Sequence, residues 1–239
     1  MSAQLASLRQ FVAGRAGAPD ADARAVIVAS GRGGVGTSVC ATLLALTAAA
    51  QGVRTLLVDG DEHVGPLRYL LGVTPERHLA DLRVGADPAS LVMPLGDTLG
   101  FVPGGAADAS VSLPPAERRA LLRRVATLFP AWDLVLVDAG SRLDGVTGWC
   151  SDPHAARLVA VMGVDAVSLA ATYALVKAVR QRTPALPAEV LVSRHDDAAA
   201  ARAFAHVEGA ARQFALGDVA YAGALPDDCL LYTSPSPRD

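Results

Sequence analysis

Long apolar runs, cysteine and net charge are all scarce in this sequence. No run of about 18 or more apolar residues occurs, so no membrane-spanning helix is expected, and the N-terminus carries no basic-then-apolar leader. Three widely spaced cysteines among 239 residues indicate neither a disulfide framework nor a metal knuckle, and a reducing cytoplasmic setting is the simplest interpretation. A formal charge of −3 gives no indication of a nucleic-acid partner.

What the sequence has in abundance is apolar residues, which make up 51% of it. Strand-like segments alternate with helical ones, which predicts a single α/β domain over 25–228 with a doubly wound, mostly parallel sheet. Strands are expected at 25–29, 54–59, 99–102, 132–138, 158–162, 189–192 and 219–224. Helices are expected at 39–50, 65–71, 78–83, 167–180 and 197–214 and after Pro114.

The two ends of the chain differ in character from this domain. Residues 1–24 form a short amphipathic stretch and a linker. Residues 229–239 (CLLYTSPSPRD) resemble the translation of a sequencing-library adapter, and we interpret them as an artefact that replaces the natural C-terminus. A disordered Ser/Pro tail is the alternative interpretation.

The most informative stretch is residues 30–38 (SGRGGVGTS), between a strand-like run and a long helix. A strand, a glycine turn and a helix together present backbone N–H groups and a helix N-terminus to an anion, usually a phosphate. The glycines also satisfy G-x-G-x-x-G, so a dinucleotide site with Asp59 on the ribose is a second interpretation. A glycine-rich turn without a ligand is a third.

Compared with the Walker A pattern G-x-x-x-x-G-K-[ST], the loop lacks one charge. Gly31 and Gly36 fit the pattern, but Thr37 stands in place of the lysine that would reach the β- and γ-phosphates. Ser38 keeps the hydroxyl that would contact Mg²⁺. The sequence therefore predicts a phosphate-binding loop with weakened affinity.

Acidic residues follow two of the expected strands. Asp59 and Asp61 end one strand, and Asp138 ends a four-residue apolar run of the Walker B type, whose acid would hold Mg²⁺ opposite Ser38. An aspartate at a strand end is also common for turn formation, so Asp138 alone decides nothing.

Four arginines follow Pro114 at helical spacing: Arg118, Arg119, Arg123 and Arg124. Such spacing favours a solvated helix face over a binding patch.

Taken together, these segments resemble the MinD/ParA family of deviant-Walker ATPases, whose loop reads K-G-G-V-G-K-[ST]. Within that family the chain is most similar to the FlhG (FleN) group, which regulates flagellar number and placement. Segments 99–105 (LGFVPGG), 173–177 (YALVK) and 221–226 (YAGALP) match motifs of that group, and Gln4, Leu8 and Arg9 match part of its N-terminal activating segment.

The resemblance implies a site, cofactors and partners. It implies ATP and Mg²⁺ as cofactors, Asp61 as the catalytic acid that orients water, and Ser38, Asp59 and Asp138 on the metal side. The implied nucleotide contacts are Gly31, Arg32, Gly33, Gly34, Val35, Gly36, Thr37, Ser38, Ser193 and Arg194. It also implies an ATP-dependent homodimer, the GTPase FlhF as a partner through residues 4–9, and peripheral binding to the inner membrane through a C-terminal helix that is missing here.

Several residues depart from the family pattern. Arg32 replaces the signature lysine, Pro66 and Ser193 replace asparagines, and Thr172 replaces an acid. Two functions therefore stay open: a weak ATPase that dimerises around ATP, or a pseudo-ATPase scaffold. The scaffold would serve flagellar assembly, or act like the cellulose-synthesis protein BcsQ or the pilus protein CpaE, which also carry an altered loop.

Overall fold

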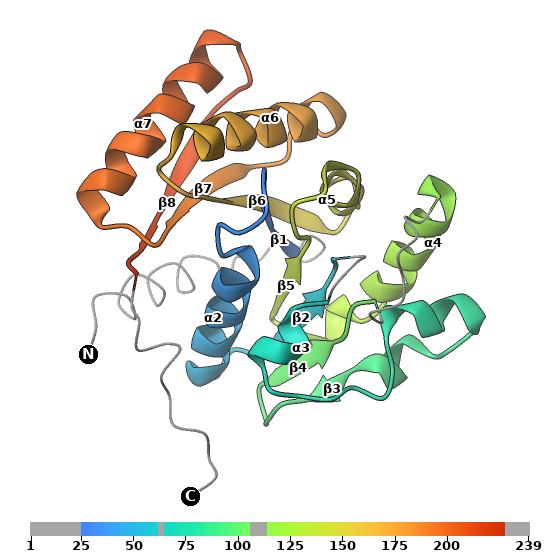
Figure 1. Ribbon diagram of the computed structural model, residues 1–239. Coiled ribbons are helices and arrows are strands. Elements are labelled where there is room, and N and C mark those ends of the chain that lie inside the picture. Colours follow the sequence, from blue (N-terminus) through green and yellow to red (C-terminus); the bar gives the residue numbers. More distant parts are fainter. Residues whose placement is uncertain (1–24, 62–64, 106–113, 228–239) are drawn as a thin grey trace, which may run out of the picture.

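The computed structural model describes residues 25–61, 65–105 and 114–227, which build an eight-stranded sheet in the order β3-β4-β2-β5-β1-β6-β7-β8 (Figure 1). The strands are β1 (Ala25–Ser30), β2 (Thr55–Asp59), β3 (Met93–Pro94), β4 (Leu99–Val102), β5 (Leu134–Asp138), β6 (Ala155–Met162), β7 (Ala188–Ser193) and β8 (Val219–Leu225). Every pairing is parallel except that of β3 with β4, which confirms the predicted α/β class with a mostly parallel sheet.

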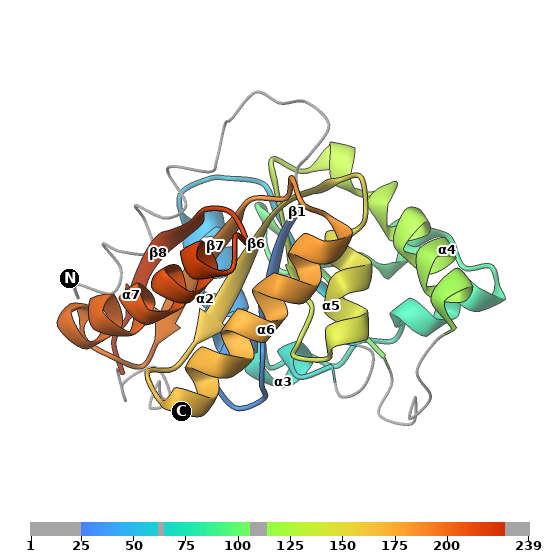
Figure 2. The same ribbon diagram turned by 90° about the horizontal axis from the view of Figure 1, so that it is seen from above.

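Helices cover both faces of this sheet (Figures 1 and 2). The helical segments are α2 (Thr37–Ala50), α3 (Leu67–Leu70), η1 (Leu79–Val84), η2 (Pro88–Leu91), α4 (Pro115–Ala126), η3 (Phe129–Ala131), α5 (Leu143–Cys150), α6 (Ala166–Arg182) and α7 (Asp197–Gln213). Helices α2 and α3 pack on one face, and α4 to α7 pack on the other.

The central strands are apolar along their whole length because both of their faces are covered. In β1, Val26 and Val28 belong to the cluster under α2, whereas Ala25, Ile27 and Ala29 belong to the cluster under α4 to α7. This alternation follows from the two-residue period of a strand.

Helix α5 is absent from the sequence-based prediction. Its sequence, LDGVTGWC, contains Gly145 and Gly148, and a glycine within a helix costs about 1 kcal/mol relative to alanine. The helix is stable here because Val146, Trp149 and Cys150 are buried against the sheet. Tertiary packing thus outweighs the local preference.

The prediction of a solvated arginine face is wrong for Arg118 and Arg124. Arg118 is buried, with 6% of its surface exposed. Arg124 donates to the carbonyl oxygens of Leu82 and Ala86, and so ties α4 to η1 and the turn that follows it.

The described helices include none with the length and apolar character needed to cross a membrane. The N-terminal segment 1–24, with the proposed contact residues 4–9, lies outside the described residues, as does the tail 229–239.

Candidate nucleotide-binding site

The loop between β1 and α2 requires glycine at several places. Gly34 and Gly36 have φ angles of 83° and 92°, a region that side chains disfavour, and Gly36 is the N-cap of α2. Gly31 lies against α6, where a Cβ atom would come within 2.2 Å of the Ala171 carbonyl group. Gly33 is the exception, since a Cβ there would meet nothing closer than 3.9 Å. The loop thus has the shape that exposes backbone N–H groups at a helix N-terminus.

Thr37 is buried beneath this loop. Its Oγ1 donates a hydrogen bond of 2.8 Å to Ser30 Oγ, which in turn donates one of 2.8 Å to the carbonyl oxygen of Arg32. These two hydroxyl groups link the end of β1 to the start of α2, and they supply no positive charge.

Arg32, in contrast, points away from the loop centre to the start of α6. Its Nη1 lies 3.0 Å from Asp165 Oδ1, and the two side chains are 42% and 55% exposed. Asp165 also accepts the N–H of Ser168 at 3.0 Å as the N-cap of α6. That hydrogen bond, and then the charge of Arg32, lower the pKa of Asp165.

Two buried carboxylates lie side by side at the carboxyl edge of the sheet. Asp59 and Asp138 end the neighbouring strands β2 and β5 and are partners in the register. Asp138 Oδ1 accepts the N–H of Gly140 at 3.1 Å, and the hydroxyl of Ser38 contacts the same carboxylate. Asp59 Oδ2 accepts the N–H of Leu67 at 3.4 Å.

Burial governs the protonation of this pair. It raises the pKa of Asp138 to about 6, against an ordinary 3.8. It raises the pKa of Asp59 well above the ordinary value too, and the charges of Asp138 and then Asp61 add to the effect. Buried charges of one sign are costly without a compensating cation.

The residues present fit a magnesium ion that takes most of its ligands from water and from substrate phosphates. Asp59 Oδ1 and Asp138 Oδ2 are buried and have no hydrogen-bond partner among the described residues. The described part of the chain contains no cluster of three or more His, Cys, Asp or Glu side chains that would hold a metal by itself. Mg²⁺ usually keeps several waters and takes one or two carboxylates together with substrate phosphates. Ser38 and the Asp59/Asp138 pair supply that kind of partial site.

Asp61 lies just beyond β2, at the same edge of the sheet. A Cβ atom on Gly140 would come within 2.8 Å of Asp61 Oδ2, so this carboxylate packs against the turn that follows β5. The structure therefore gathers Ser38, Asp59, Asp61 and Asp138 on neighbouring segments.

The two remaining predicted residues follow β7. Ser193 is buried, its hydroxyl bonds the Cys40 thiol, and a Cβ on Gly36 would lie 3.0 Å from its Oγ. Arg194 is exposed with a φ of 66°, and its Nε lies 3.4 Å from Asp227 Oδ1. Ser193 thus supports the loop from behind, and Arg194 points to the C-terminal side of β8.

Comparison with known proteins gives one relative in sequence and several in fold. It is 28% identical to the antiactivator FleN of Pseudomonas aeruginosa over 207 residues, which cover 85% of this chain and 73% of FleN. This chain has a MinD/ParA-like fold and resembles FleN. No protein-family profile matches it.

Solved structures agree on the MinD/ParA-like fold. A variant of McdA from Cyanothece in complex with ATP superposes with a TM-score of 0.69 at 18% identity, covering 88% of this chain and 86% of McdA. The septum site-determining protein MinD of Pyrococcus horikoshii, complexed with Mg-ADP, gives a TM-score of 0.65 at 21% identity, covering 86% of this chain and 82% of MinD.

In this MinD/ParA-like chain, sequence reasoning missed three residues that shape the site. Ser30 relays the hydrogen bond of Thr37, and Asp165 holds Arg32. Gly104 leaves room for a carboxylate, since a Cβ there would lie 2.8 Å from Asp59 Cγ. The only sequence signal for Gly104 is its place two residues after the end of β4, within the segment 99–105.

Proposed function

We propose that this chain is a MinD/ParA-like regulator that binds ATP with Mg²⁺ weakly, dimerises around it and hydrolyses it slowly. The observation that carries this proposal is the pair of unpartnered buried carboxylate oxygens beside Ser38, at the base of a loop shaped to receive phosphate. A dinucleotide site is disfavoured because NAD requires neither that pair nor the hydroxyl.

The residues of the chain have separable roles in this proposal. The backbone N–H groups of residues 31–38 and the N-terminus of α2 bind the phosphates. Ser38, Asp59 and Asp138 hold the ion, which when bound neutralises charge on the β- and γ-phosphates. Asp61 orients the attacking water. Arg32 contacts phosphate once it leaves Asp165, because a guanidinium binds phosphate with two parallel hydrogen bonds.

Thr37 sets the affinity. A hydrogen bond to a charged group contributes about 1.5–3 kcal/mol, so the missing lysine weakens ATP binding by roughly 10- to 150-fold. We therefore expect a dissociation constant no tighter than roughly tens of micromolar. Hydrolysis loses further, because the same charge stabilises the transition state.

The test is calorimetric titration of ATP with and without Mg²⁺, together with a Thr37→Lys variant. We expect weak, Mg²⁺-dependent binding that the variant strengthens at least tenfold, with a parallel rise in ATPase rate. Gln51→Lys, which adds the same charge at the far end of α2, is the matched control and should change neither quantity. Submicromolar binding by the unaltered chain, or Mg²⁺-independent binding, contradicts the proposal.

A pseudo-ATPase scaffold is the second candidate, and one observation favours it. Arg32, Thr37 and Ser193 are all engaged in contacts within the chain, with Asp165, Ser30 and Cys40 respectively. A scaffold predicts no turnover in Thr37→Lys and no change in oligomeric state with ATP. Light scattering with and without ATP·Mg²⁺ separates the two functions, since the first requires a dimer.

The biological role rests on the likeness to FleN. We propose that the chain regulates flagellar number and placement, and expression in Pseudomonas aeruginosa lacking FleN tests it. Restored flagellar number supports this role, and no effect of a stably produced protein contradicts it. Contact with FlhF through residues 4–9 stays a prediction, because that segment lies outside the described residues, and binding to the membrane stays a prediction too.

A further inference from the structure

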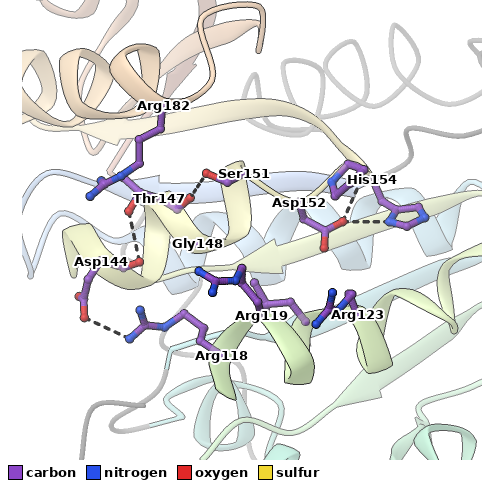
Figure 3. Close-up of a pocket in the computed structure, with 12 residues that line it drawn as sticks. Arg118, Arg119, Arg123, Asp144, Thr147, Gly148, Ser151, Asp152, His154 and Arg182 are labelled. Atoms are coloured by element: carbon purple, nitrogen blue, oxygen red, sulfur yellow. Dashed lines mark hydrogen bonds and ion pairs between the residues drawn. The ribbon is translucent and has the colours of Figure 1, made fainter. Parts of the chain in front are cut away.

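A cavity of about 530 Å³ lies between α4 and α5, on the face of the sheet opposite α2 (Figure 3). It extends from Asp144, near the start of α5, to His154, directly before the amino end of β6. Arg119 and Arg123 project from α4 into this space, and Arg182 approaches it from the last turn of α6 (Figure 3).

The cavity carries positive charge that the described residues do not neutralise. Its two carboxylates are already engaged: Asp144 lies 3.1 Å from Arg118, and Asp152 lies 2.9 Å from His154 Nδ1. The side chains of Arg119, Arg123 and Arg182 make no hydrogen bond or ion pair within the part of the chain that the structure describes. Three guanidinium groups thus line one cavity without a carboxylate partner among the described residues, and an anion bound there would be attracted by all of them.

The wall of the cavity formed by α5 leaves space for the buried side chain of Arg118. Gly148 of α5 leaves room for the buried side chain of Arg118, because a Cβ there would come within 2.9 Å of Arg118 Cδ. That glycine costs helix stability of about 1 kcal/mol relative to alanine. Leu122 and Pro153 add apolar surface next to the charges. A ligand would therefore find both a cationic and an apolar wall.

We propose that this cavity binds a small molecule that carries phosphate groups. Its volume falls in the range of about 300–1,000 Å³ that small-molecule sites occupy. Guanidinium groups match the geometry of phosphate oxygens, and several cations suit a ligand with more than one negative charge. An acidic protein segment is less suited, since it would lie along an exposed face, whereas Arg118, which lines the cavity, is buried.

The test is calorimetric titration with inorganic pyrophosphate in the absence of Mg²⁺. All proteins carry Gly33→Asp, which places a carboxylate in the phosphate loop, at a glycine where a Cβ would meet nothing closer than 3.9 Å, and suppresses anion binding there. Removing two cations with Arg119→Ala/Arg123→Ala should weaken pyrophosphate binding at least tenfold. Arg202→Ala, which removes an exposed arginine from α7, is the matched control and should leave binding unchanged.

Each other outcome overturns the proposal. If the double variant melts at the same temperature as its parent and binds pyrophosphate equally well, then pyrophosphate binds outside this cavity. Citrate binding as tight as pyrophosphate binding removes the preference for phosphate. Binding of a ten-residue glutamate peptide without binding of pyrophosphate makes the cavity a protein docking surface. None of these results depends on whether the loop after β1 binds ATP.

Discussion

Replacement of Asp138 by asparagine should stabilise the nucleotide-free protein. The side chain keeps its shape, and its oxygen continues to accept the N–H of Gly140. What is lost is a buried negative charge beside Asp59, with one oxygen that has no partner in the described chain. Under the proposed function, a residue that binds a cation thus weakens the fold when that cation is absent.

The magnitude follows from the pKa. Burial raises the pKa of Asp138 from 3.8 to about 6, and each pKa unit corresponds to about 1.36 kcal/mol, so ionisation costs on the order of 3 kcal/mol at neutral pH. For a chain of this size about 1 kcal/mol shifts the melting temperature by roughly 2–4 °C. Asp138→Asn should therefore melt roughly 6–12 °C higher than the unaltered protein at about pH 7.5.

The sign of the pH dependence gives a second check. Because the folded-state pKa is raised, Asp138 favours folding below about pH 4, and this contribution is lost as the pH rises through about 6. The advantage of Asp138→Asn should be full at about pH 7.5 and close to zero at about pH 4.

Thermal melts in EDTA without nucleotide measure this directly. Asp97→Asn, which removes an exposed aspartate, serves as the control and should leave the melting temperature unchanged. A variant of Asp138 that melts lower than the unaltered protein, or one whose gain is the same at both pH values, would refute the reasoning.

Four further substitutions probe the loop and α4. Gly31→Ala should cost several kcal/mol in the free energy of unfolding, on the order of an overpacked core, whereas Gly33→Ala should cost little; urea denaturation compares them. Thr37→Val should lower that free energy by about 1 kcal/mol, because Ser30 loses the donor to its hydroxyl. Arg124→Ala should cost about 1–3 kcal/mol and speed amide hydrogen exchange in η1, whose carbonyl it holds; unchanged exchange would contradict that role.

The fold was largely predictable from the sequence because its strands have a clear sequence pattern. Buried parallel strands read as continuous apolar runs, and β2 and β5 each end in an aspartate at the edge where ligands bind. Helix α5 was not predicted, because Gly145 and Gly148 disfavour a helix locally, while the packing that stabilises it comes from residues far away in the chain.

The site was predictable in composition but not in contacts. The sequence indicates that Thr37 removes a charge, yet its bond to Ser30 exists only because the glycine turn folds residue 37 back onto residue 30. Likewise, helical spacing showed that four arginines share one helix. It did not show that Arg118 packs beside Gly148 or that Arg124 reaches the carbonyl of Leu82, since those pairs depend on how α4 packs.

Helix α6 has a mechanical consequence for the whole molecule. Its first turn holds Arg32 through Asp165, its backbone at Ala171 leaves no room above Gly31, and its last residue reaches the arginine cavity. Seventeen residues at about 1.5 Å each make a strut of about 25 Å. A shift of the loop toward α6 would therefore clash with this helix, and a rigid shift of the helix in response would move Arg182 at the opposite edge of the sheet.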